Sequence, residues 1–375
     1  MSRLLGTALL PLLVSACLEP QDSPVDAGTT DAEATTTAHD GTGSASPAQS
    51  SSVADETVSD ETGATQPEDS DTASDTDSGS DTSSDDGVPP PGWDPNAIPA
   101  PTGPCPDLSE GWNTFCPEGI TPLCRETYVR RGAAAGGPLN IYWHGTYENA
   151  VDVQQWGAGA GVLAATLADD GLAFYPEADP DAINRPNQPF PWWIVGSIEN
   201  DRLDDFYFMD EMVACAAESG LIDVDRINTG GMSAGGVITS SIVGRRGYFA
   251  SAVSWSGGRT DPFTAPGETS VMVIHGGPSD CSFNYCFMGP STYFAEMLDA
   301  QGVFAFLCDH SEGDTSINHH IDALGETGGL FMSLARRGQP HPWEKYPIGG
   351  DGGNWTLDNF CYRPGQESPW APWSG

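Results

Sequence analysis

A serine between two glycines is the feature of this sequence that most directly suggests chemistry. Residues 226 to 243 read RINTGGMSAGGVITSSIV, which places Ser233 between Gly231 and Gly235 in a G-x-S-x-G pattern. A sharp turn from a strand into a helix exposes the middle side chain, and flanking residues there must lack a Cβ. A serine hydroxyl on such a turn becomes a nucleophile when a histidine, an acid and an oxyanion site are supplied. The pattern predicts a catalytic Ser233, with an ordinary buried turn serine as the alternative.

The acid of such a triad is expected after Ser233, at the end of a later strand. The run SVMVIHGGPSD places Asp280 just beyond an apolar stretch. A turn-capping aspartate is the alternative, because Asp beside Gly, Pro and Ser often has that role. His275 ends the stretch itself, too early to be the base, and is expected to be structural.

The base is expected last in the chain, after the apolar run VFAFLCD. We predict His319, with His320 as the alternative, because both lie on a loop just before an expected helix, from where a base can swing over the edge of a sheet. His310 directly ends the apolar run. His341 precedes a proline in an irregular tail. His310 and His341 therefore rank below His319 and His320 as candidates for the base.

Two backbone N–H groups are needed for the oxyanion. One is expected from Ala234, at the positive end of the helix that follows the serine. The other is expected from Thr146, just after NIYWHG, with Tyr147 as the alternative. His144 and Gly145 would shape that turn, although H-G at a strand end is also compatible with a simple tight turn.

Short apolar runs and helical stretches alternate around these residues. LAFYPEA, FASAVSWSGG and TSVMVIHGG are typical strands, whereas RLDDFYFMDEMVACAAESGLI and STYFAEMLDAQG have helical spacing. Such alternation predicts an α/β fold with a mostly parallel sheet and helices on both faces. Ser233, His144 and His275 all fall at strand ends, where sites in such sheets form.

One long segment breaks this alternation. DPDAINRPNQPFPWWIVGSIENDR is rich in Pro and Asn and carries Trp192 and Trp193. Long loops in compact domains are often functional, so both indoles are candidate substrate-binding groups on an apolar cleft. Packing over the edge of the sheet is the alternative.

The N-terminus predicts export. Residues 1–17 contain one positive charge at Arg3 and then an apolar run that is too short to span a bilayer. The end of this segment, VSAC, resembles a bacterial lipobox, so Cys17 is expected to carry a lipid anchor. An ordinary signal peptide is the alternative. The mature protein is expected on the outer membrane or cell surface, or secreted.

Residues 18–92 are expected to form a disordered acidic tether. The segment consists largely of Ser, Thr, Asp, Glu, Ala, Gly and Pro and has no lysine or arginine. Low apolar content and dense like charge keep such a chain solvated and extended. Calcium binding by the acidic runs is an alternative, but their spacing matches no loop with defined ligand positions.

Charge limits the partners of the remaining part. The tether holds 18 of the 53 acidic residues, so residues 93–375 have 35 acidic against 13 basic residues, a net charge near −22. Such a surface repels phosphate backbones and anionic lipid headgroups, so we expect no binding to nucleic acid. Residues 93–375 suffice for one large domain, which we expect to be monomeric.

Eight cysteines besides Cys17 predict disulfides in an exported chain, but they allow 105 pairings. A zinc site is not expected, because paired C-x-x-C spacing is missing.

Together these segments resemble a known family. WHGTYENA, DDFYFMDEMVACAAESGLIDVDRINTGGMSAGG, VMVIHGGPSD and the late histidine pair occur in the order seen in α/β-hydrolases of the polyhydroxybutyrate depolymerase and feruloyl esterase type, over residues 125 to 335. The resemblance implies an α/β-hydrolase fold and a secreted serine esterase for hydroxyalkanoate or hydroxycinnamate esters, with no cofactor or metal. It assigns the triad to Ser233, Asp280 and one of His319 or His320.

This sequence departs from the family pattern at two points. The acid loop HGGPSD has one residue more than the usual H-G-x-x-D and continues into CSFNYC, which suggests a small disulfide loop between Cys281 and Cys286. The base follows Asn318 where the family has glycine. Other functions remain open: a serine peptidase or acyltransferase on the same fold, or a non-catalytic surface lipoprotein that binds polymer or sugar.

Overall fold

The computed structural model describes residues 94–120, 123–183, 190–193, 203–310, 324–345 and 361–364. The contacts within the chain separate residues 1–79 from residues 80–375, and every described residue belongs to the second unit. The expected boundaries after residues 17 and 92 lie outside the described residues and stay predictions.

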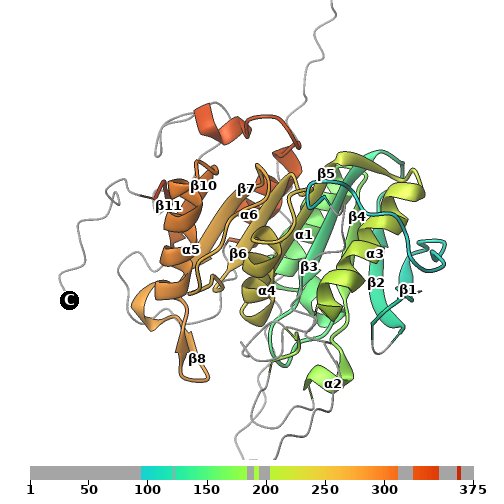
Figure 1. Cartoon of the computed structure of the whole chain (residues 1–375), viewed down its shortest axis with the longest axis horizontal. Coiled ribbons are helices and arrows are strands. Elements are labelled where there is room, and N and C mark those ends of the chain that lie inside the picture. The colour runs from blue at the N-terminus through green and yellow to red at the C-terminus, as the bar shows by residue number, and fades with distance from the viewer. Residues whose placement is uncertain are drawn as a thin grey trace, which may run out of the picture. The chain divides into compact units, whose positions relative to one another are not determined.

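Nine strands of the described part form one mixed sheet (Figure 1). Their order is β1-β2-β4-β3-β5-β6-β7-β10-β11, and all neighbours from β4 to β10 are parallel. Antiparallel strands extend both edges. The strands are β1 (Gly111–Phe115), β2 (Arg125–Arg131), β3 (Gly137–Trp143), β4 (Leu172–Pro176), β5 (Ile222–Met232), β6 (Ser251–Trp255), β7 (Ser270–His275), β8 (Cys281–Ser282), β9 (Tyr285–Cys286), β10 (Ala305–Asp309) and β11 (Cys361–Tyr362).

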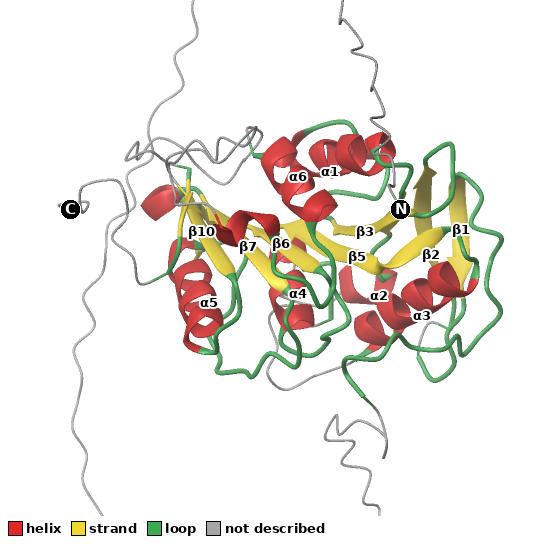
Figure 2. Ribbon diagram, turned by 90° about the horizontal axis from the view of Figure 1, so that it is seen from above, coloured by secondary structure: helices red, strands yellow, loops and turns green. Residues whose placement is uncertain are grey.

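Helices cover both faces of the sheet (Figure 2). α1 and α6 lie on one face, and α3, α4 and α5 lie on the other. The helices are α1 (Gly157–Ala168), α2 (Pro180–Ile183), α3 (Asp204–Glu218), α4 (Ala234–Val243), α5 (Met288–Ala300) and α6 (Gly325–Leu334). Short 3-10 turns occur at Asp152–Gln154, Gly277–Ser279 and Pro342–Lys345. The predicted three-layer α/β architecture is confirmed.

The two faces of the sheet explain the apolar pattern of its central strands. All seven residues of β3 are buried, as expected for a parallel strand covered on both sides. Because side chains alternate along a strand, Leu139, Ile141 and Trp143 join the core beneath α3 and α4. Tyr142, between two of them, joins the core beneath α1 and α6. A near-continuous apolar run therefore serves two separate cores.

Some elements were not expected from the sequence. β1 lies between residues 94 and 124, a segment rich in Pro and Cys for which no strand was predicted, and it forms an edge of the sheet. The described part of the long Trp-containing segment includes the short helix α2. β5 begins at Ile222, several residues before the apolar INTGG stretch, because its first part pairs with Gly137 across a register shift.

Four disulfides join the eight cysteines of the described part. The pairs are Cys105–Cys215, Cys116–Cys124, Cys281–Cys286 and Cys308–Cys361. The expected small loop between Cys281 and Cys286 is confirmed. Disulfides persist in oxidising compartments outside the cytoplasm, so this set agrees with the predicted export. Among the described helices, none combines the length and apolar character needed to cross a membrane.

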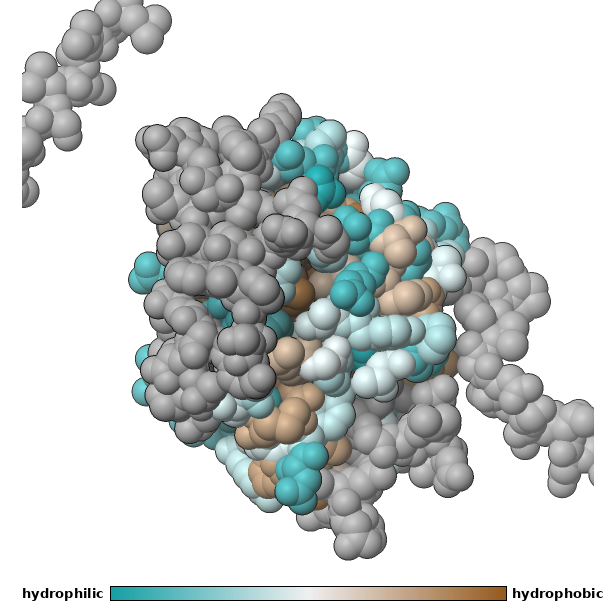
Figure 3. All heavy atoms as spheres, turned by 90° about the vertical axis from the view of Figure 1, so that its left-hand side faces the viewer, coloured by the Kyte–Doolittle hydropathy of each residue, from teal (hydrophilic) through white to brown (hydrophobic). Residues whose placement is uncertain are grey.

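Hydrophobic residues on the face shown in Figure 3 form small patches between hydrophilic ones. Scattered apolar residues of this kind are normal on a protein surface. The view does not show a broad apolar face among the coloured residues.

Candidate active site

Ser233 occupies a strained turn between β5 and α4. Its backbone has φ 58° and ψ −121°, a conformation that residues other than glycine rarely adopt. The Ser233 N–H donates to Trp255 O on β6 at 2.9 Å, and Val237 N–H donates to Ser233 O at 2.9 Å as α4 begins. The serine is therefore fixed by the sheet on one side and by the helix on the other. Only 7% of its surface is exposed.

The two glycines of the G-x-S-x-G pattern are required by the end of β3. A Cβ on Gly231 would lie 2.5 Å from Trp143 O, and one on Gly235 would lie 1.9 Å from the same atom. Real Cβ atoms essentially never come this close to backbone. The carbonyl at the end of β3 thus packs directly against the turn that carries Ser233.

The loop after β3 reaches the serine as well. A Cβ on Gly145 would lie 3.3 Å from Ser233 Cβ, so Gly145 lies beside Ser233 with no room for a side chain to spare. The Gly145 N–H donates to Glu148 Oε2 at 2.5 Å, which closes a tight turn over Thr146 and Tyr147. Tyr147 has φ 66°. Thr146, the predicted second oxyanion donor, therefore follows a residue that lies beside the serine, and Ala234 is the first residue of α4.

His144 is held as a neutral ring beneath this turn. Its Nδ1 lies 2.8 Å from Gly145 O, to which it donates as the Nδ1–H tautomer. Burial lowers the pKa of His144 to about 4. The ring lies against Trp192, with centroids 4.8 Å apart. His144 thus shapes the turn after β3 by packing and by one hydrogen bond.

Both tryptophans of the long segment point into the protein. Trp192 is fully buried, and its indole N–H donates to His144 O at 2.9 Å. Trp193 is 7% exposed, and its indole N–H donates to Asp179 Oδ2 at 2.6 Å. This arrangement corresponds to the packing alternative. Substrate contact by either ring stays a prediction.

A buried ion pair explains the D-D-x-x-F motif that residues 204–208 (DDFYF) form at the start of α3. Asp205 Oδ1 lies 2.5 Å from Arg125 Nη1, and Asp205 Oδ2 accepts the Trp193 N–H at 2.6 Å. The Arg125 guanidinium packs 4.3 Å above the ring of Phe208, the last residue of the motif. Removing one partner of such a buried pair costs about 3–5 kcal/mol. The motif therefore anchors the segment that supports the turn after β3.

Asp280 lies in the loop after β7 and is completely buried. Its Oδ2 accepts hydrogen bonds from Ser256 Oγ at 2.8 Å and from Gly276 N–H at 2.9 Å. Ser256 directly follows β6 and has φ 42°, another strained conformation. Two donors on one carboxylate oxygen hold the group in one orientation, as an orienting acid requires. Sequence reasoning missed Ser256, because nothing in the chain between residues 256 and 280 signals the contact.

The structure describes His275, His310 and His341 but not the two histidines predicted as the base. His319 and His320, the two candidates for the base, lie outside the described residues, so neither is placed relative to Ser233. His275 is buried at the end of β7, and its Nδ1 accepts the Gly277 N–H at 3.0 Å. The backbone N–H of His310 donates to His275 O at 3.0 Å, which continues the pairing of β7 and β10.

His341 is packed in an apolar environment. Its ring stacks on Phe331 with centroids 4.1 Å apart, and Nε2 lies 3.1 Å from Phe331 O. Its Nδ1 accepts the Trp343 N–H at 3.1 Å. Burial lowers the pKa of His341 to about 4, so the ring is neutral with both nitrogens bonded. These contacts give His341 a structural role.

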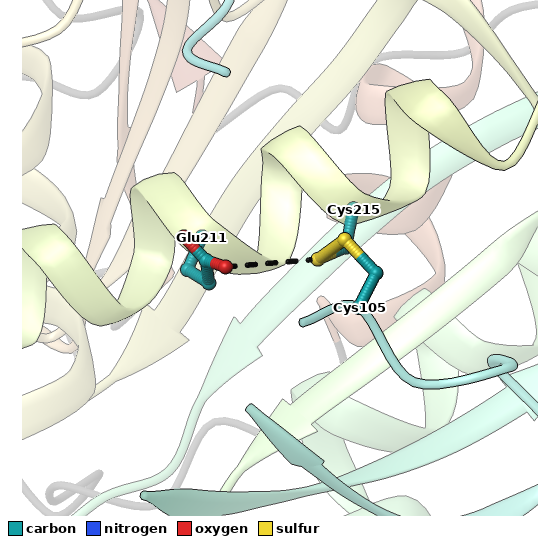
Figure 4. A group of neighbouring side chains, drawn as sticks. All are labelled: Cys105, Glu211 and Cys215. Carbon is teal, nitrogen blue, oxygen red and sulfur yellow. Dashed lines mark hydrogen bonds between the residues drawn. A yellow bond between two sulfur atoms is a disulfide. The ribbon is translucent and has the colours of Figure 1, made fainter. Parts of the chain in front are cut away.

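One group of side chains resembles a metal site by its spacing alone. Cys105, Glu211 and Cys215 have ligand atoms within 4.8 Å of one another (Figure 4). The two sulfurs form a disulfide, so neither offers a thiolate. The Glu211 carboxylate accepts the backbone N–H groups of Thr102 and Gly103 at 2.7 and 2.8 Å. The group ties the segment before β1 to α3 and is unsuited to a metal ion.

A cavity of about 670 Å³ lies elsewhere in the described part. Its lining includes Ile98, Tyr207 and Arg245, from the segment before β1, from α3 and from the end of α4. Ser233 precedes α4, whereas Arg245 follows it, so the cavity is at the opposite end of this helix. We therefore place the candidate site at Ser233 and not in this cavity, because the predicted chemistry depends on the serine.

The strand order, the parallel core and the strand–serine–helix turn define an α/β-hydrolase fold. A serine-to-cysteine variant of pOPH in complex with DMSO matches with a TM-score of 0.54 at 18% identity, over 74% of this chain and 99% of that chain. A serine-to-alanine variant of pOPH in complex with pNPB gives the same values. Native pOPH matches with a TM-score of 0.52 at 19% identity, over 68% and 96% of the two chains. At this identity the likeness concerns the fold alone.

No protein-family model matches the sequence, and no curated protein matches it.

Proposed function

We propose that the protein is an extracytoplasmic serine hydrolase of carboxylic esters. The observation that carries this proposal is Ser233 itself: a non-glycine residue at φ 58° between a strand and a helix, beside Gly145. A strained serine held by two neighbouring glycines and an adjoining strand end is the arrangement that exposes a nucleophile in this fold. The buried and hydrogen-bonded Asp280, in the loop after the later strand β7, supports the same reading.

The proposed reaction has two halves. The base, His319 or His320, takes the proton of Ser233 Oγ as this oxygen bonds to the ester carbonyl carbon. The negative charge on the carbonyl oxygen is held by the N–H groups of Ala234 and Thr146. The base then gives the proton to the departing alcohol oxygen, which leaves an acyl-serine. Water, deprotonated by the same base, releases the acid and restores Ser233.

Asp280 has an orienting part in this mechanism. Its carboxylate would accept the second ring N–H of the base and stabilise the imidazolium that forms in each half-reaction. The donors Ser256 and Gly276 hold one carboxylate oxygen, which restricts rotation of the group. Preorganisation of this kind is the usual contribution of a triad acid.

We propose hydroxyalkanoate or hydroxycinnamate esters as the substrate class, as the sequence resemblance implies. The acidic surface supports neutral rather than anionic substrates, because like charges repel. A variant of pOPH is known in complex with pNPB, so pNPB is a suitable first probe. Hydroxybutyrate oligomers and feruloyl esters can then be compared on one preparation.

The test is the loss of turnover in Ser233→Ala. We expect the purified chain to hydrolyse pNPB, and the variant to lose at least about 10³-fold in kcat, because removing a triad nucleophile has a larger effect still in other hydrolases. Ser241→Ala is the matched control, since Ser241 lies on the same helix and its hydroxyl bonds only back to Val237 O among the described contacts. Full activity of Ser233→Ala would refute the proposal.

Two further measurements separate the other functions. Turnover of peptides faster than of esters would assign a peptidase, and no reaction of Ser233 with a fluorophosphonate probe alongside polymer binding would assign a non-catalytic module. Separate His319→Ala and His320→Ala variants identify the base by which one loses activity.

For location, we propose the three-part arrangement of residues 1–17, 18–92 and 93–375, with a lipid on Cys17. Four disulfides support an oxidising compartment. Incorporation of labelled palmitate that is lost in Cys17→Ala would establish the anchor, whereas equal incorporation by both chains would contradict it.

A further inference from the structure

Two exposed aromatic side chains meet beside the residues of the proposed site. Tyr147 is 80% exposed and Phe283 is 51% exposed, and their ring centroids lie 5.6 Å apart in an edge-to-face arrangement. Tyr147 is the most exposed of the large hydrophobic residues in the described part. Aromatic rings normally gain stability by burial, so this pair is not explained by core packing.

Each ring is carried by backbone in an unfavourable conformation. Tyr147 has φ 66°, Phe283 has φ 50° and Asn284 has φ 63°. Left-handed backbone costs roughly 1–2 kcal/mol for each residue with a Cβ. Strain of this kind persists where the surrounding structure imposes it, and it gathers at sites of ligand contact.

A closed hairpin presents Phe283. β8 and β9 pair as a two-stranded ribbon with Phe283 and Asn284 at its tip, and the Cys281–Cys286 disulfide joins its base. In Figure 1 this hairpin projects from the body of the domain. A covalent closure restricts a loop that is too short to be stable alone. Phe283 is therefore offered on a rigid support.

Both rings are close in sequence to proposed catalytic groups. Tyr147 follows Thr146, and Gly145, which precedes Thr146, lies beside Ser233. Phe283 comes three residues after Asp280. β3, β5 and β7 are parallel, so the loops that follow them lie at the same edge of the sheet. The ring contact shows that the oxyanion loop and the acid loop meet there.

We propose that Tyr147 and Phe283 form the specificity-determining wall of the Ser233 site and bind an aromatic group of a neutral ester. The inference rests on the proposed esterase function. An aromatic group that stacks on this pair covers apolar surface that is otherwise in water, and offset or edge-to-face contacts add to the gain. The carboxylate of Glu148, bonded to the same turn, disfavours an anionic group.

The experiment compares four esters on one preparation of the full chain. Methyl cinnamate against methyl butyrate tests an aromatic group on the acyl side, and phenyl acetate against methyl acetate tests one on the alcohol side. We expect Phe283→Ala and Tyr147→Ala each to lower the kcat/KM ratio of aromatic to aliphatic ester about tenfold in one of the two pairs. Phe283→Tyr keeps the ring and should keep the ratio.

A second aromatic pair provides the matched control. Trp112 is 47% exposed and contacts Tyr128 edge-to-face at 5.2 Å, on the outer strands β1 and β2. Trp112→Ala should leave both ratios unchanged. Because each ratio uses one preparation, a partly unfolded variant does not distort it.

The outcomes separate the inference from the proposed function. If methyl butyrate is hydrolysed with full dependence on Ser233 but both ratios stay at the wild-type value in Phe283→Ala and Tyr147→Ala, the wall is refuted and the esterase stands. An equal fall of the ratio in Trp112→Ala would also refute it. If none of the four esters is hydrolysed, the function and the wall fail together.

Discussion

Gly145 offers the sharpest test of the proposal that the loop after β3 supplies an oxyanion donor. It lies between Glu148 and Ser233, and a Cβ added there would be 2.9 Å from Glu148 Oε2, 3.3 Å from Met232 O and 3.3 Å from Ser233 Cβ. The carboxylate is the end of a side chain and can yield, whereas Met232 O and Ser233 Cβ belong to the turn itself. Gly145→Ala should therefore move the loop away from the serine by a few tenths of an ångström without unfolding the protein.

The size of the effect follows from the distance. A full oxyanion donor contributes about 2.7–4 kcal/mol, and a displacement of about 1 Å costs about 10²-fold in rate. A shift of a few tenths of an ångström should therefore cost about 1 kcal/mol, or about fivefold in kcat. KM should change little, because an oxyanion contact is made mainly in the transition state.

The assay is steady-state hydrolysis of pNPB, with thermal unfolding measured in parallel. Alanine substitutions at two other glycines serve as controls, one expected to be harmless and one expected to prevent folding. A Cβ on Gly289, in the first turn of α5, meets nothing within 4 Å, so Gly289→Ala should keep wild-type kinetics. A Cβ on Gly235 would lie 1.9 Å from a backbone oxygen, so Gly235→Ala should not fold. A wild-type kcat for Gly145→Ala, or a change in KM alone, would show that this loop does not supply the donor.

Three further predictions concern the stability of the folded protein. Removing the Ser256 hydroxyl deprives the Asp280 carboxylate of a donor, so Ser256→Ala should lower the free energy of unfolding by about 1.5–3 kcal/mol. Ser256→Gly should lose about 1 kcal/mol less, because glycine tolerates φ 42°; equal losses in denaturant titrations would contradict the strain. His341 has a pKa of about 4 in the folded protein against about 6.5 in the unfolded chain. Its contribution to the free energy of unfolding is therefore fully present above pH 6.5, and about 3 kcal/mol of it is lost as the pH falls to 4. His341→Phe should reduce the slope of unfolding free energy near pH 5 by about 1.4 kcal/mol per pH unit, and an unchanged slope would rule out this titration. The Cys105–Cys215 disulfide closes a sequence separation of 110 residues. Replacing both cysteines by serine should cost about 4–5 kcal/mol in the same titrations, and a loss below about 1 kcal/mol would show that α3 holds this segment without it.

The turn that carries Ser233 and the central sheet were predictable because their signals are local. Gly231 and Gly235 bracket Ser233, and the apolar runs of β3 and β7 read directly as buried strands. Local chemistry also sufficed for Cys281 with Cys286, which are close enough in sequence to pair in a small loop.

Contacts between distant segments could not be predicted in this way. Asp205 was visible in a motif, but its partner Arg125 is 80 residues away. Ser256 and Asp280 are joined by the pairing of β6 with β7, which no spacing reveals. β1 has little apolar character and becomes a strand because β2 pairs with it. The base stays open between His319 and His320 for the separate reason that both lie outside the described residues.

The bonds just before β1 have a mechanical consequence for a chain held at its N-terminus. Tension arriving from residue 94 onward meets the hydrogen bond from Gly247 N–H to Pro95 O, then Thr102 and Gly103, which are bonded to Glu211, and then the covalent link from Cys105 to Cys215. The load passes into α3, so the edge strand β1 is not peeled from the sheet. Pulling single molecules from the N-terminus should extend them in one step at high force, and reductant should split this into an early release of β1 followed by the rest.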